Sequence, residues 1–290
     1  MFSLVSSSSA APARPGRAAL AARRAVAARA SLTSCRLCAH RCDADRSRGP
    51  AGLCRAGPFA RVFSAQTEVS DELELGPVFA IALSGCDLRC DFCITGRESW
   101  DARAGEPLDL DALAARATAA IAAGARTVMI LGGEPTIHLP DALALAAALP
   151  ENARLAWKTN AHASPEARAL LDGVFDVWVA DYKFGNDACA ARLARVPGYT
   201  ATVRETLLWA ARDHDMIIRH LLMPGHVECC WRPVAAWLAA HLPGVRVGLR
   251  EGFWPAWRAG AHPELRQPAA SAELALARRI AADHGLRLTA

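Results

Sequence analysis

Three cysteines, Cys86, Cys90 and Cys93, are the residues of this chain whose type and spacing point most directly to chemistry. They follow an apolar segment in the pattern C-x-x-x-C-x-x-C. Three thiolates can hold one small iron–sulfur cluster, whereas a closed structural site takes four protein ligands. The pattern therefore predicts a four-iron cluster with one iron left open for a substrate or a cofactor.

A second group of cysteines, Cys35, Cys38, Cys42 and Cys54, lies closer to the N-terminus. Four thiolates close a site, so zinc and an additional iron–sulfur cluster both fit, and His40 is a possible replacement for one ligand. The chain has ten cysteines and no secretory signal sequence, and seven of the ten fall into these two groups. Such grouping indicates metal binding rather than a disulfide framework, and it predicts a reducing, cytoplasmic location.

The composition is that of a globular protein. Hydrophobic residues make up 52% and charged residues 21% of the 290 residues, which excludes a disordered chain. No apolar run approaches the roughly 20 residues of a membrane span, so we expect no membrane partner.

The positive net charge belongs to the N-terminus. Residues 1–42 hold seven arginines and no acidic residue, so the rest of the chain carries a small negative net charge. A broad surface for nucleic acid is therefore not expected. Only two of the 33 basic residues, Lys158 and Lys183, are lysines. In a chain that otherwise uses arginine, these two carry more information than any single arginine.

The character of the sequence changes along the chain. Residues 1–30 are rich in Ser, Ala and Arg and predict a disordered or leader segment, residues 31–75 a Cys-rich metal-binding segment, residues 76–255 a catalytic core, and residues 256–290 a C-terminal helical extension. Within the core, apolar runs alternate with helical patterns. The expected strands are 78–83, 127–131, 155–158, 174–180, 216–223 and 245–249, and the expected helices are 108–123, 140–149, 231–241 and 271–284.

Strand–helix alternation predicts an α/β fold with a parallel sheet covered by helices. The segment from Val78 to Pro255 has room for about six βα units of about 30 residues. A closed eight-unit barrel typically needs ~250 residues, which is more than this segment offers. Polar or Gly-rich motifs follow most of the strands, which favours a partial (β/α)6 TIM-like barrel with one active face and a small Cys-rich N-terminal extension.

The segment Gly132-Gly133-Glu134-Pro135 follows the second expected strand. Together with the cysteine triplet after the first, it resembles the radical S-adenosylmethionine enzymes over roughly residues 78–250. That resemblance implies a [4Fe-4S] cluster on the triplet, with S-adenosylmethionine on the open iron. It also implies reductive cleavage to a 5′-deoxyadenosyl radical that abstracts a hydrogen atom from a substrate. Gly132 and Gly133 would let the backbone approach the methionine moiety, and Glu134 would accept a hydrogen bond from its ammonium group.

Two further motifs resemble the pyruvate formate-lyase activating enzyme branch. Asp181-Tyr182-Lys183 matches a D-x-K segment, and 219–225 matches R-x-x-x-x-P-G. The resemblance implies that Asp181 and Lys183 hold the ribose hydroxyls and the carboxylate of the cofactor. Where that branch resembles D-T-N-G, this chain has Lys158-Thr159-Asn160-Ala161, so Asn160 is expected to replace the aspartate.

Several residues near these motifs have two possible uses. Arg219 and His220 point to opposite faces of a strand, so only one of them is expected to face the cofactor, and we include His220 among the cofactor-binding residues. His138 either lines the site or lies on a surface loop. Cys229 and Cys230 follow the fifth strand and are either hydrogen-atom donors or ordinary small residues that open a helix.

The expected function is that of a radical S-adenosylmethionine oxidoreductase that receives electrons from a flavodoxin- or ferredoxin-type donor. The resemblance implies a glycyl-radical enzyme as the partner that is activated. Radical modification of a peptide or a small molecule is the second possibility, and a non-catalytic iron–sulfur or zinc protein that senses redox state is the third.

Overall fold

The computed structural model describes residues 16–289, and six parallel strands form its centre. These strands are β2 (Val78–Leu83), β4 (Thr127–Gly132), β5 (Leu155–Thr159), β6 (Val177–Asp181), β7 (Asp215–Leu221) and β8 (Arg246–Arg250). They are buried along most of their length, as expected for parallel strands that have helices on one face and a packed lumen on the other. The predicted partial (β/α)6 barrel is confirmed.

Three short or edge strands extend this sheet to the order β3-β1-β2-β4-β5-β6-β7-β8-β9. β1 (Arg61–Glu68) runs antiparallel to both β2 and β3 (Glu106–Pro107), and β9 (Arg287–Leu288) runs parallel to β8. The C-terminal extension therefore contributes a strand as well as a helix. The sequence did not predict these three strands, because they lack the continuous apolar runs of buried parallel strands.

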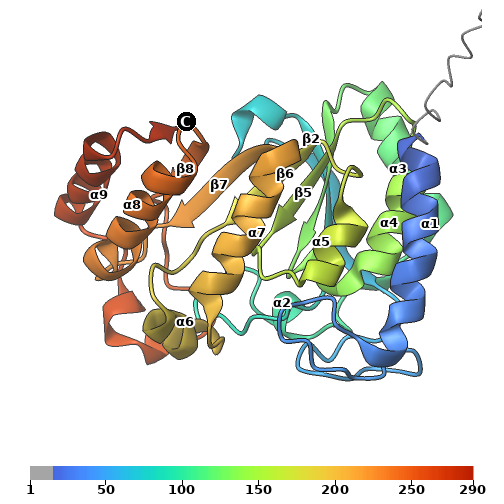
Figure 1. Cartoon of the computed structure of the whole chain (residues 1–290), viewed down its shortest axis with the longest axis horizontal. Coiled ribbons are helices and arrows are strands. Elements are labelled where there is room, and N and C mark those ends of the chain that lie inside the picture. The colour runs from blue at the N-terminus through green and yellow to red at the C-terminus, as the bar shows by residue number, and fades with distance from the viewer. Residues whose placement is uncertain (1–15, 290) are drawn as a thin grey trace, which may run out of the picture.

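Helices cover the outer face of the sheet (Figure 1). They are α3 (Leu110–Ala122), α4 (Leu139–Ala148), α5 (Pro165–Leu171), α6 (Asp187–Ala194), α7 (Tyr199–Asp213), α8 (Arg232–His241) and α9 (Ser271–Asp283), with the short α2 (Arg97–Trp100) after the cysteine triplet. Short 3-10 turns occur at 31–34, 73–75, 135–138, 259–261 and 263–266, and a π-helical turn, η4, spans Val227–Trp231. None of the described helices has the length and apolar character required to cross a membrane.

The inner face of the barrel has its own apolar layer. Leu75, Val78, Met129 and Val179 belong to this cluster, which is separate from the main core under the helices. Leu75 comes from the segment before β2 and fills the lumen near the N-terminal ends of the strands, where its carbonyl accepts a hydrogen bond from Thr127 Oγ1 at 2.9 Å. The lumen therefore has an apolar floor, and polar residues lie nearer the C-terminal ends of the strands.

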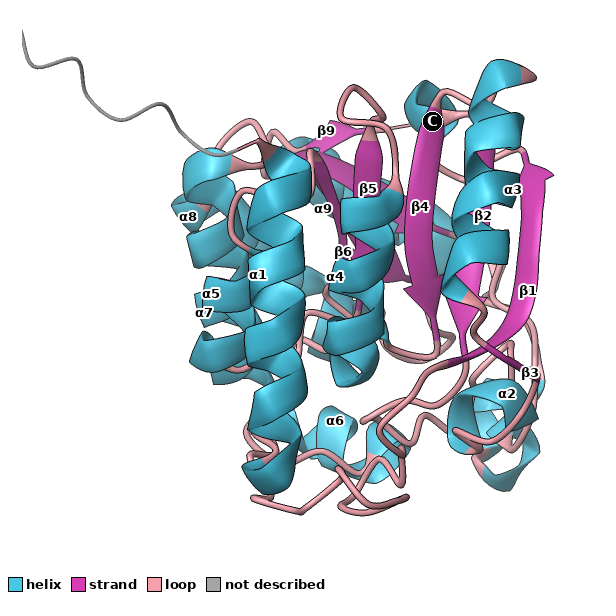
Figure 2. Ribbon diagram, turned by 90° about the vertical axis from the view of Figure 1, so that its right-hand side faces the viewer, coloured by secondary structure: helices cyan, strands magenta, loops and turns pink. Residues whose placement is uncertain are grey.

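The described part of the N-terminal segment forms a helix. α1 (Arg17–Ala30) packs against α4 and α5 and forms an outer layer over the barrel helices (Figure 2). The Glu151 carboxylate accepts a hydrogen bond from Ala18 N at 3.0 Å and caps this helix, while Arg17 donates to the Ala146 carbonyl of α4 at 2.7 Å. The prediction of a disordered segment is therefore wrong for residues 16–30. Residues 1–15 lie outside the described part of the chain.

The prediction of disorder came from composition, and it was wrong because alanine side chains make the contact between α1 and α4. Ala21 and Ala28, seven residues apart and thus on one face of the helix, are fully buried. An alanine face lets two helix backbones approach closely but looks like compositional bias in a sequence rich in alanine.

The packing of α1 predicts the effect of enlarging this face. Ala28→Leu should lower the free energy of unfolding by about 1–3 kcal/mol, because the added methyl groups have no space beside α4. Ala27→Leu, at the exposed neighbouring position, is the matched control and should stay within about 0.5 kcal/mol of the parent chain. Urea unfolding followed by circular dichroism measures both, and equal values for the two variants would contradict the docking of α1.

Candidate active site

The cysteine triplet lies in the loop that follows β2, at the C-terminal ends of the parallel strands. Cys86 and Cys90 are buried, and Cys93 is half-buried. The Leu88 N–H points to Cys86 Sγ at 3.3 Å, and Thr95 Oγ1 lies 3.3 Å from Cys93 Sγ. Hydrogen bonds to the sulfur atoms stabilise and tune cluster-bound thiolates, so this loop fits an iron–sulfur cluster.

Burial keeps the Cys86 and Cys90 thiols protonated when no metal is bound, as their raised pKa values show. Burial raises the pKa of Cys90 to about 12, against the opposing influence of the Lys183 charge. Burial also raises the pKa of Cys86 well above its ordinary value. These thiols become ligands only when a metal displaces their protons, as is general for metal sites in proteins.

The second predicted motif packs directly on the triplet loop. Gly133 N donates to the Leu83 carbonyl, and Glu134 N donates to the Gly85 carbonyl, both at 2.9 Å. A Cβ atom on Gly132 would lie 2.0 Å from Leu83 O, and one on Gly133 would lie 2.0 Å from Gly85 O. In this structure, therefore, the two glycines are required by the close approach of two protein loops.

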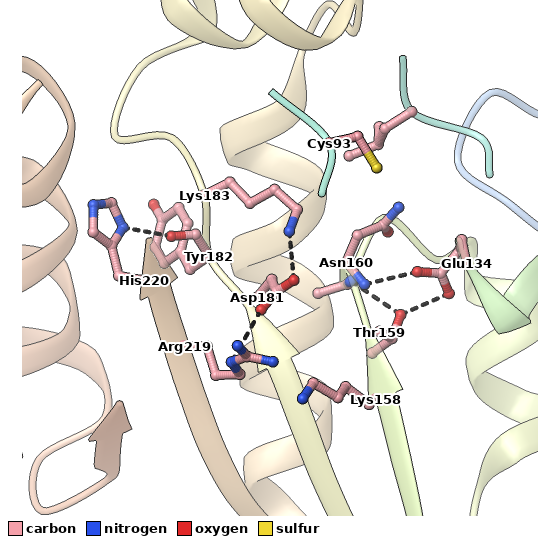
Figure 3. A network of polar contacts seen from close by, with 12 residues as sticks. Cys93, Glu134, Lys158, Thr159, Asn160, Asp181, Tyr182, Lys183, Arg219 and His220 are labelled. Carbon is pink, nitrogen blue, oxygen red and sulfur yellow. Dashed lines mark hydrogen bonds and ion pairs between the residues drawn. The ribbon is translucent and has the colours of Figure 1, made fainter. Parts of the chain in front are cut away.

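The Glu134 side chain joins the loops after β4 and β5 (Figure 3). Its carboxylate accepts hydrogen bonds from Thr136 N at 3.0 Å, Thr159 Oγ1 at 2.8 Å and Asn160 N at 2.7 Å. Burial, and secondarily the charge of Asp87, raise the pKa of Glu134 to about 7. Protein donors already meet this buried carboxylate, so the structure gives Glu134 a positioning role, and its contact with a ligand ammonium group stays a prediction.

A buried polar network connects Cys86 to the N-terminal Cys-rich segment. Asp87 contacts His162 Nδ1 at 2.7 Å and accepts a hydrogen bond from Asn160 Nδ2 at 2.8 Å. The same amide nitrogen lies 3.7 Å from Cys86 Sγ, so Asn160 points to the triplet loop and not to the barrel lumen. His40 Nε2 lies 3.0 Å from the Asp87 carbonyl oxygen, and the His40 and His162 rings are 4.9 Å apart.

Asp181 and Lys183, at the end of β6, form an ion pair between the lumen and the triplet (Figure 3). Burial raises the pKa of Asp181, but the charges of Lys183 and Arg219 outweigh it and lower the pKa to about 2. Burial lowers the pKa of Lys183, yet Asp181 and then Cys90 reverse the effect and raise it. Both groups are therefore charged at neutral pH, as the sequence prediction of a fixed cation and an acceptor requires.

Glu72, in the segment before β2, organises the deeper part of the lumen. Its fully buried carboxylate lies 3.2 Å from Lys158 Nζ, 3.2 Å from Arg219 Nε and 3.0 Å from an Arg250 terminal nitrogen. Lys158 therefore belongs to this polar lumen, and Lys183 borders it through Asp181, which lies 3.7 Å from Arg219. Glu72 was missed because its neighbours in sequence carry no motif.

The lumen holds a donor that its own residues do not satisfy. Within residues 16–289, the Nε atom of Arg250 is buried without a hydrogen-bond partner, whereas Arg219 Nε meets the Glu72 carboxylate. Buried donors of this kind normally find an acceptor, so the lumen fits a ligand that carries oxygen acceptors.

His220 and His138 have structural positions. His220 lies on the outer side of β7, where its Nδ1 atom is 2.7 Å from the Tyr182 carbonyl and its ring packs on Trp231. Arg219 is the residue that faces inward, so the prediction of a cofactor contact for His220 is wrong (Figure 3). His138 is buried, with Nε2 2.8 Å from the Ser84 carbonyl, and burial lowers its pKa to about 3. It is neither a surface histidine nor a proton donor at neutral pH.

The second cysteine group lies beside the triplet loop, as two hydrogen bonds from Arg89 show. Arg89 donates to the Leu53 carbonyl at 3.0 Å and to the Cys54 carbonyl at 3.3 Å. Arg46 is 1% exposed and donates to Cys35 Sγ at 3.4 Å, and no acidic side chain of residues 16–289 pairs with it. The other guanidinium nitrogens of Arg46 donate to the Ala56 and Gly57 carbonyls, both at 3.0 Å, so this buried cation is fixed beside the Cys35 sulfur.

The sulfur atoms of this group are widely spaced. No three of the four lie within 4.8 Å of one another in the described chain. Tetrahedral zinc, with Zn–S bonds of about 2.3 Å, would place them about 3.8 Å apart. A single zinc ion would therefore require these sulfurs to lie closer together than they do here.

Cys229 and Cys230 lie in η4, after β7. Their sulfur atoms face Cys189 of α6 and His226, and not the Asp181–Lys183 pair. Phe253 is part of the core, whereas Trp254 and Trp257 are exposed.

The loop contact at Gly133 gives a direct test of this site. Gly133→Ala should push the triplet loop away from β4, lowering both the melting temperature and the iron bound per chain after anaerobic reconstitution. Gly252→Ala is the control, because a Cβ atom there meets nothing within 4 Å. Full iron binding by Gly133→Ala would show that the two loops do not need their close approach.

Comparisons with known proteins agree with this geometry. The family model described as "Radical SAM superfamily" matches residues 81–238. Uncharacterized protein MJ0674 of Methanocaldococcus jannaschii is 29% identical over 265 residues, which cover 88% of this chain and 76% of that protein. A 7-carboxy-7-deazaguanine synthase from Pyrobaculum aerophilum is 36% identical over 84 residues, or 28% of this chain and 36% of that enzyme.

Solved structures share the fold. SuiB of Streptococcus suis, bound to its precursor peptide SuiA, superposes with a TM-score of 0.53 at 16% identity over 70% of this chain. The match spans only 46% of the SuiB chain. A radical SAM methyltransferase from Sphaerobacter thermophilus gives a TM-score of 0.52 at 18% identity, covering 72% of this chain and 65% of the methyltransferase.

Proposed function

Because this chain belongs to the radical SAM superfamily, we propose that it abstracts a hydrogen atom from a glycine of a partner enzyme. The observation that carries the proposal is the position of the Asp181–Lys183 ion pair beside the buried triplet of Cys86, Cys90 and Cys93. When bound, a reduced four-iron cluster and S-adenosylmethionine supply a 5′-deoxyadenosyl radical that removes a hydrogen atom from a substrate. The three thiols and the lumen donors fit these two groups.

The residues of this chain hold the reactants in place. The Lys183 ammonium is suited to the carboxylate of S-adenosylmethionine, and Asp181 is suited to accept from its hydroxyl or ammonium groups. Glu134 fixes the two loops that flank the triplet, and the tightly packed loop at Gly133 keeps side chains away from Cys86. Glu72 balances the charge of the lumen cations without reaching the triplet itself.

A protein substrate is favoured by the surface beside Cys93. Ile94, the next residue, is 71% exposed, and the exposed Trp257 packs against Gly96 and lies 5.9 Å from the Trp100 ring. Trp254, three residues before Trp257, is also exposed. Large apolar side chains in water are typical of interaction surfaces, and a small-molecule substrate would not require them. The resemblance of 181–183 and 219–225 to the activating enzymes supports a glycyl-radical enzyme as that partner.

We propose that the N-terminal cysteine group holds a second iron–sulfur cluster that passes electrons to the triplet. Arg89 bonds the backbone of Cys54 and immediately precedes Cys90, so the two groups are neighbours in space. An external flavodoxin or ferredoxin would then deliver electrons at the surface where Cys42 is exposed.

The catalytic proposal predicts that anaerobically reconstituted protein releases 5′-deoxyadenosine from S-adenosylmethionine in the presence of dithionite. Cys90→Ala should abolish release, and Lys183→Met should weaken cofactor binding about tenfold or more, since a charge-assisted hydrogen bond contributes about 1.5–3 kcal/mol. Liquid chromatography quantifies the product. Equal release by the Cys90→Ala control would leave only the redox-sensing function.

The choice of substrate needs a separate measurement. A glycyl-radical enzyme encoded near this chain should give a glycyl doublet in electron paramagnetic resonance after incubation, and its Gly→Ala variant should not. Cofactor cleavage without that doublet would favour another peptide or a small molecule as the substrate.

The relay proposal predicts the metal content of a Cys86/Cys90/Cys93→Ala triple variant. It should retain about four irons per chain, held by the N-terminal group. Adding Cys38→Ser should remove this iron. A triple variant without iron after reconstitution would eliminate the relay.

A further inference from the structure

A third group of ligand-type side chains lies outside the site described above. Cys189 is in α6, His226 precedes η4, and Cys229 and Cys230 are within η4. The three sulfur atoms and His226 Nδ1 all lie within 4.8 Å of one another. Cys189 Sγ is 3.8 Å from Cys229 Sγ, and Cys229 Sγ is 3.9 Å from Cys230 Sγ.

These separations match the edges of the coordination tetrahedron around a zinc ion. Zn–S bonds of about 2.3 Å and Zn–N bonds of about 2.0–2.1 Å give sulfur–sulfur edges of about 3.8 Å and sulfur–nitrogen edges of about 3.5 Å. The distances from His226 Nδ1 to the sulfurs of Cys189, Cys229 and Cys230 are 3.6, 3.3 and 3.5 Å. One ion at the centre would contact all four atoms at normal bond lengths.

We propose that Cys189, His226, Cys229 and Cys230 bind one zinc ion in a closed, structural site. Four protein ligands leave no open position, so the site does not activate water or substrate. Soft thiolates and an imidazole in tetrahedral arrangement select zinc over magnesium, calcium or manganese. This inference is independent of the proposed reaction.

The local fold explains how two consecutive cysteines reach one ion. The turn η4 is π-helical, with Trp231 N donating to the His226 carbonyl at 3.2 Å, and this wider turn brings Cys229 and Cys230 to the same side as His226. Asn186 fixes the other half, because its side chain accepts from Cys189 N at 2.8 Å and donates to the Cys229 carbonyl at 2.7 Å.

Gly185 allows the close approach of the segment after β6 to η4. A Cβ atom on Gly185 would lie 2.3 Å from the Cys230 carbonyl oxygen. The segment after β6 can therefore approach η4 only with glycine at this position, which brings Cys189 within reach of the other ligands.

Two charged side chains surround the other ring nitrogen of His226. His226 Nε2 lies 3.7 Å from Glu264 Oε1, and Arg192 joins this carboxylate at 2.5 Å. At 3.7 Å this carboxylate is a charged neighbour of the ring and not a hydrogen-bond partner; with Nδ1 on the metal, Nε2 carries the proton on that side. Three thiolates and one zinc ion leave one negative charge, which Arg192, 3.3 Å from Nε2, is placed to balance.

The ion would stabilise the active site from a distance. The C-terminal end of α6 accepts hydrogen bonds from the triplet loop, Arg89 N to Ala194 O at 3.0 Å and Asp91 N to Leu193 O at 2.9 Å. Lys183 lies two residues before Gly185, in the segment that leads into α6. Zinc at the start of α6 would therefore link β6, α6 and the turn after β7 into one support for the triplet and for Lys183.

The test is zinc content in the Cys86/Cys90/Cys93→Ala triple variant, which removes the catalytic cluster. We expect about one zinc per chain, lost on adding Cys229→Ser or His226→Ala and retained on adding Glu228→Gln, an exposed neighbour in the same turn. His226→Cys should keep the zinc with a fourth thiolate, which separates metal loss from misfolding. Zinc K-edge absorption should show three sulfur and one nitrogen neighbours for the parent site.

Three outcomes would overturn the site. They are zinc content unchanged by Cys229→Ser and His226→Ala, iron instead of zinc at these ligands, and a disulfide between two of the three cysteines in the metal-loaded protein. Failure of the catalytic proposal would look different, because the protein would then hold its zinc and release no 5′-deoxyadenosine.

Discussion

The close backbone contact between the loops after β2 and β4 is the constraint on which the site depends. Gly133 and Gly85 approach so closely that no side chain fits between them, and their hydrogen bonds fix the triplet loop against the sheet. Glu134 then extends this support to β5, and the C-terminal end of α6 supports the loop from the other side. A cluster that must exchange electrons without reorganising benefits from ligands held by backbone rather than by mobile side chains.

Electrostatics imposes a second requirement on the same region. Lys183 lies near Cys90, Arg46 near Cys35, and Arg192 near His226, so a cation accompanies each of the three cysteine groups in the described chain. Lys183 is paired with Asp181, Arg46 donates to the Ala56 and Gly57 carbonyls, and the exposed Arg192 is paired with Glu264. Each is also placed to balance the negative charge that metal-bound thiolates would carry, while Glu72 neutralises the cations of the deeper lumen.

Sequence patterns predicted the parts of the fold in which neighbours along the chain carry the signal. Continuous apolar runs located all six central strands to within about three residues, and the triplet and Gly-rich loops appeared where expected. The direction of side chains was harder to predict. Alternation along a strand puts Arg219 and His220 on opposite faces, but it does not show which of the two faces inward. Contacts between distant segments gave no signal at all: the Glu72 cluster joins 72, 158, 219 and 250, and the alanine face of α1 resembles compositional bias.

The three cysteine groups differ in geometry in a way that follows from what each must bind. Cys86, Cys90 and Cys93 come from a single loop and supply three ligands, which leaves a position for a reactant. The N-terminal group offers four thiols that are more widely spaced, which suits the proposed second cluster with one thiolate per iron. The group at Cys189 and His226 is complete and compact, as a single ion requires. Since α6 connects the compact group to the triplet loop, a redox-inert ion there can hold in place ligands whose own metal changes oxidation state.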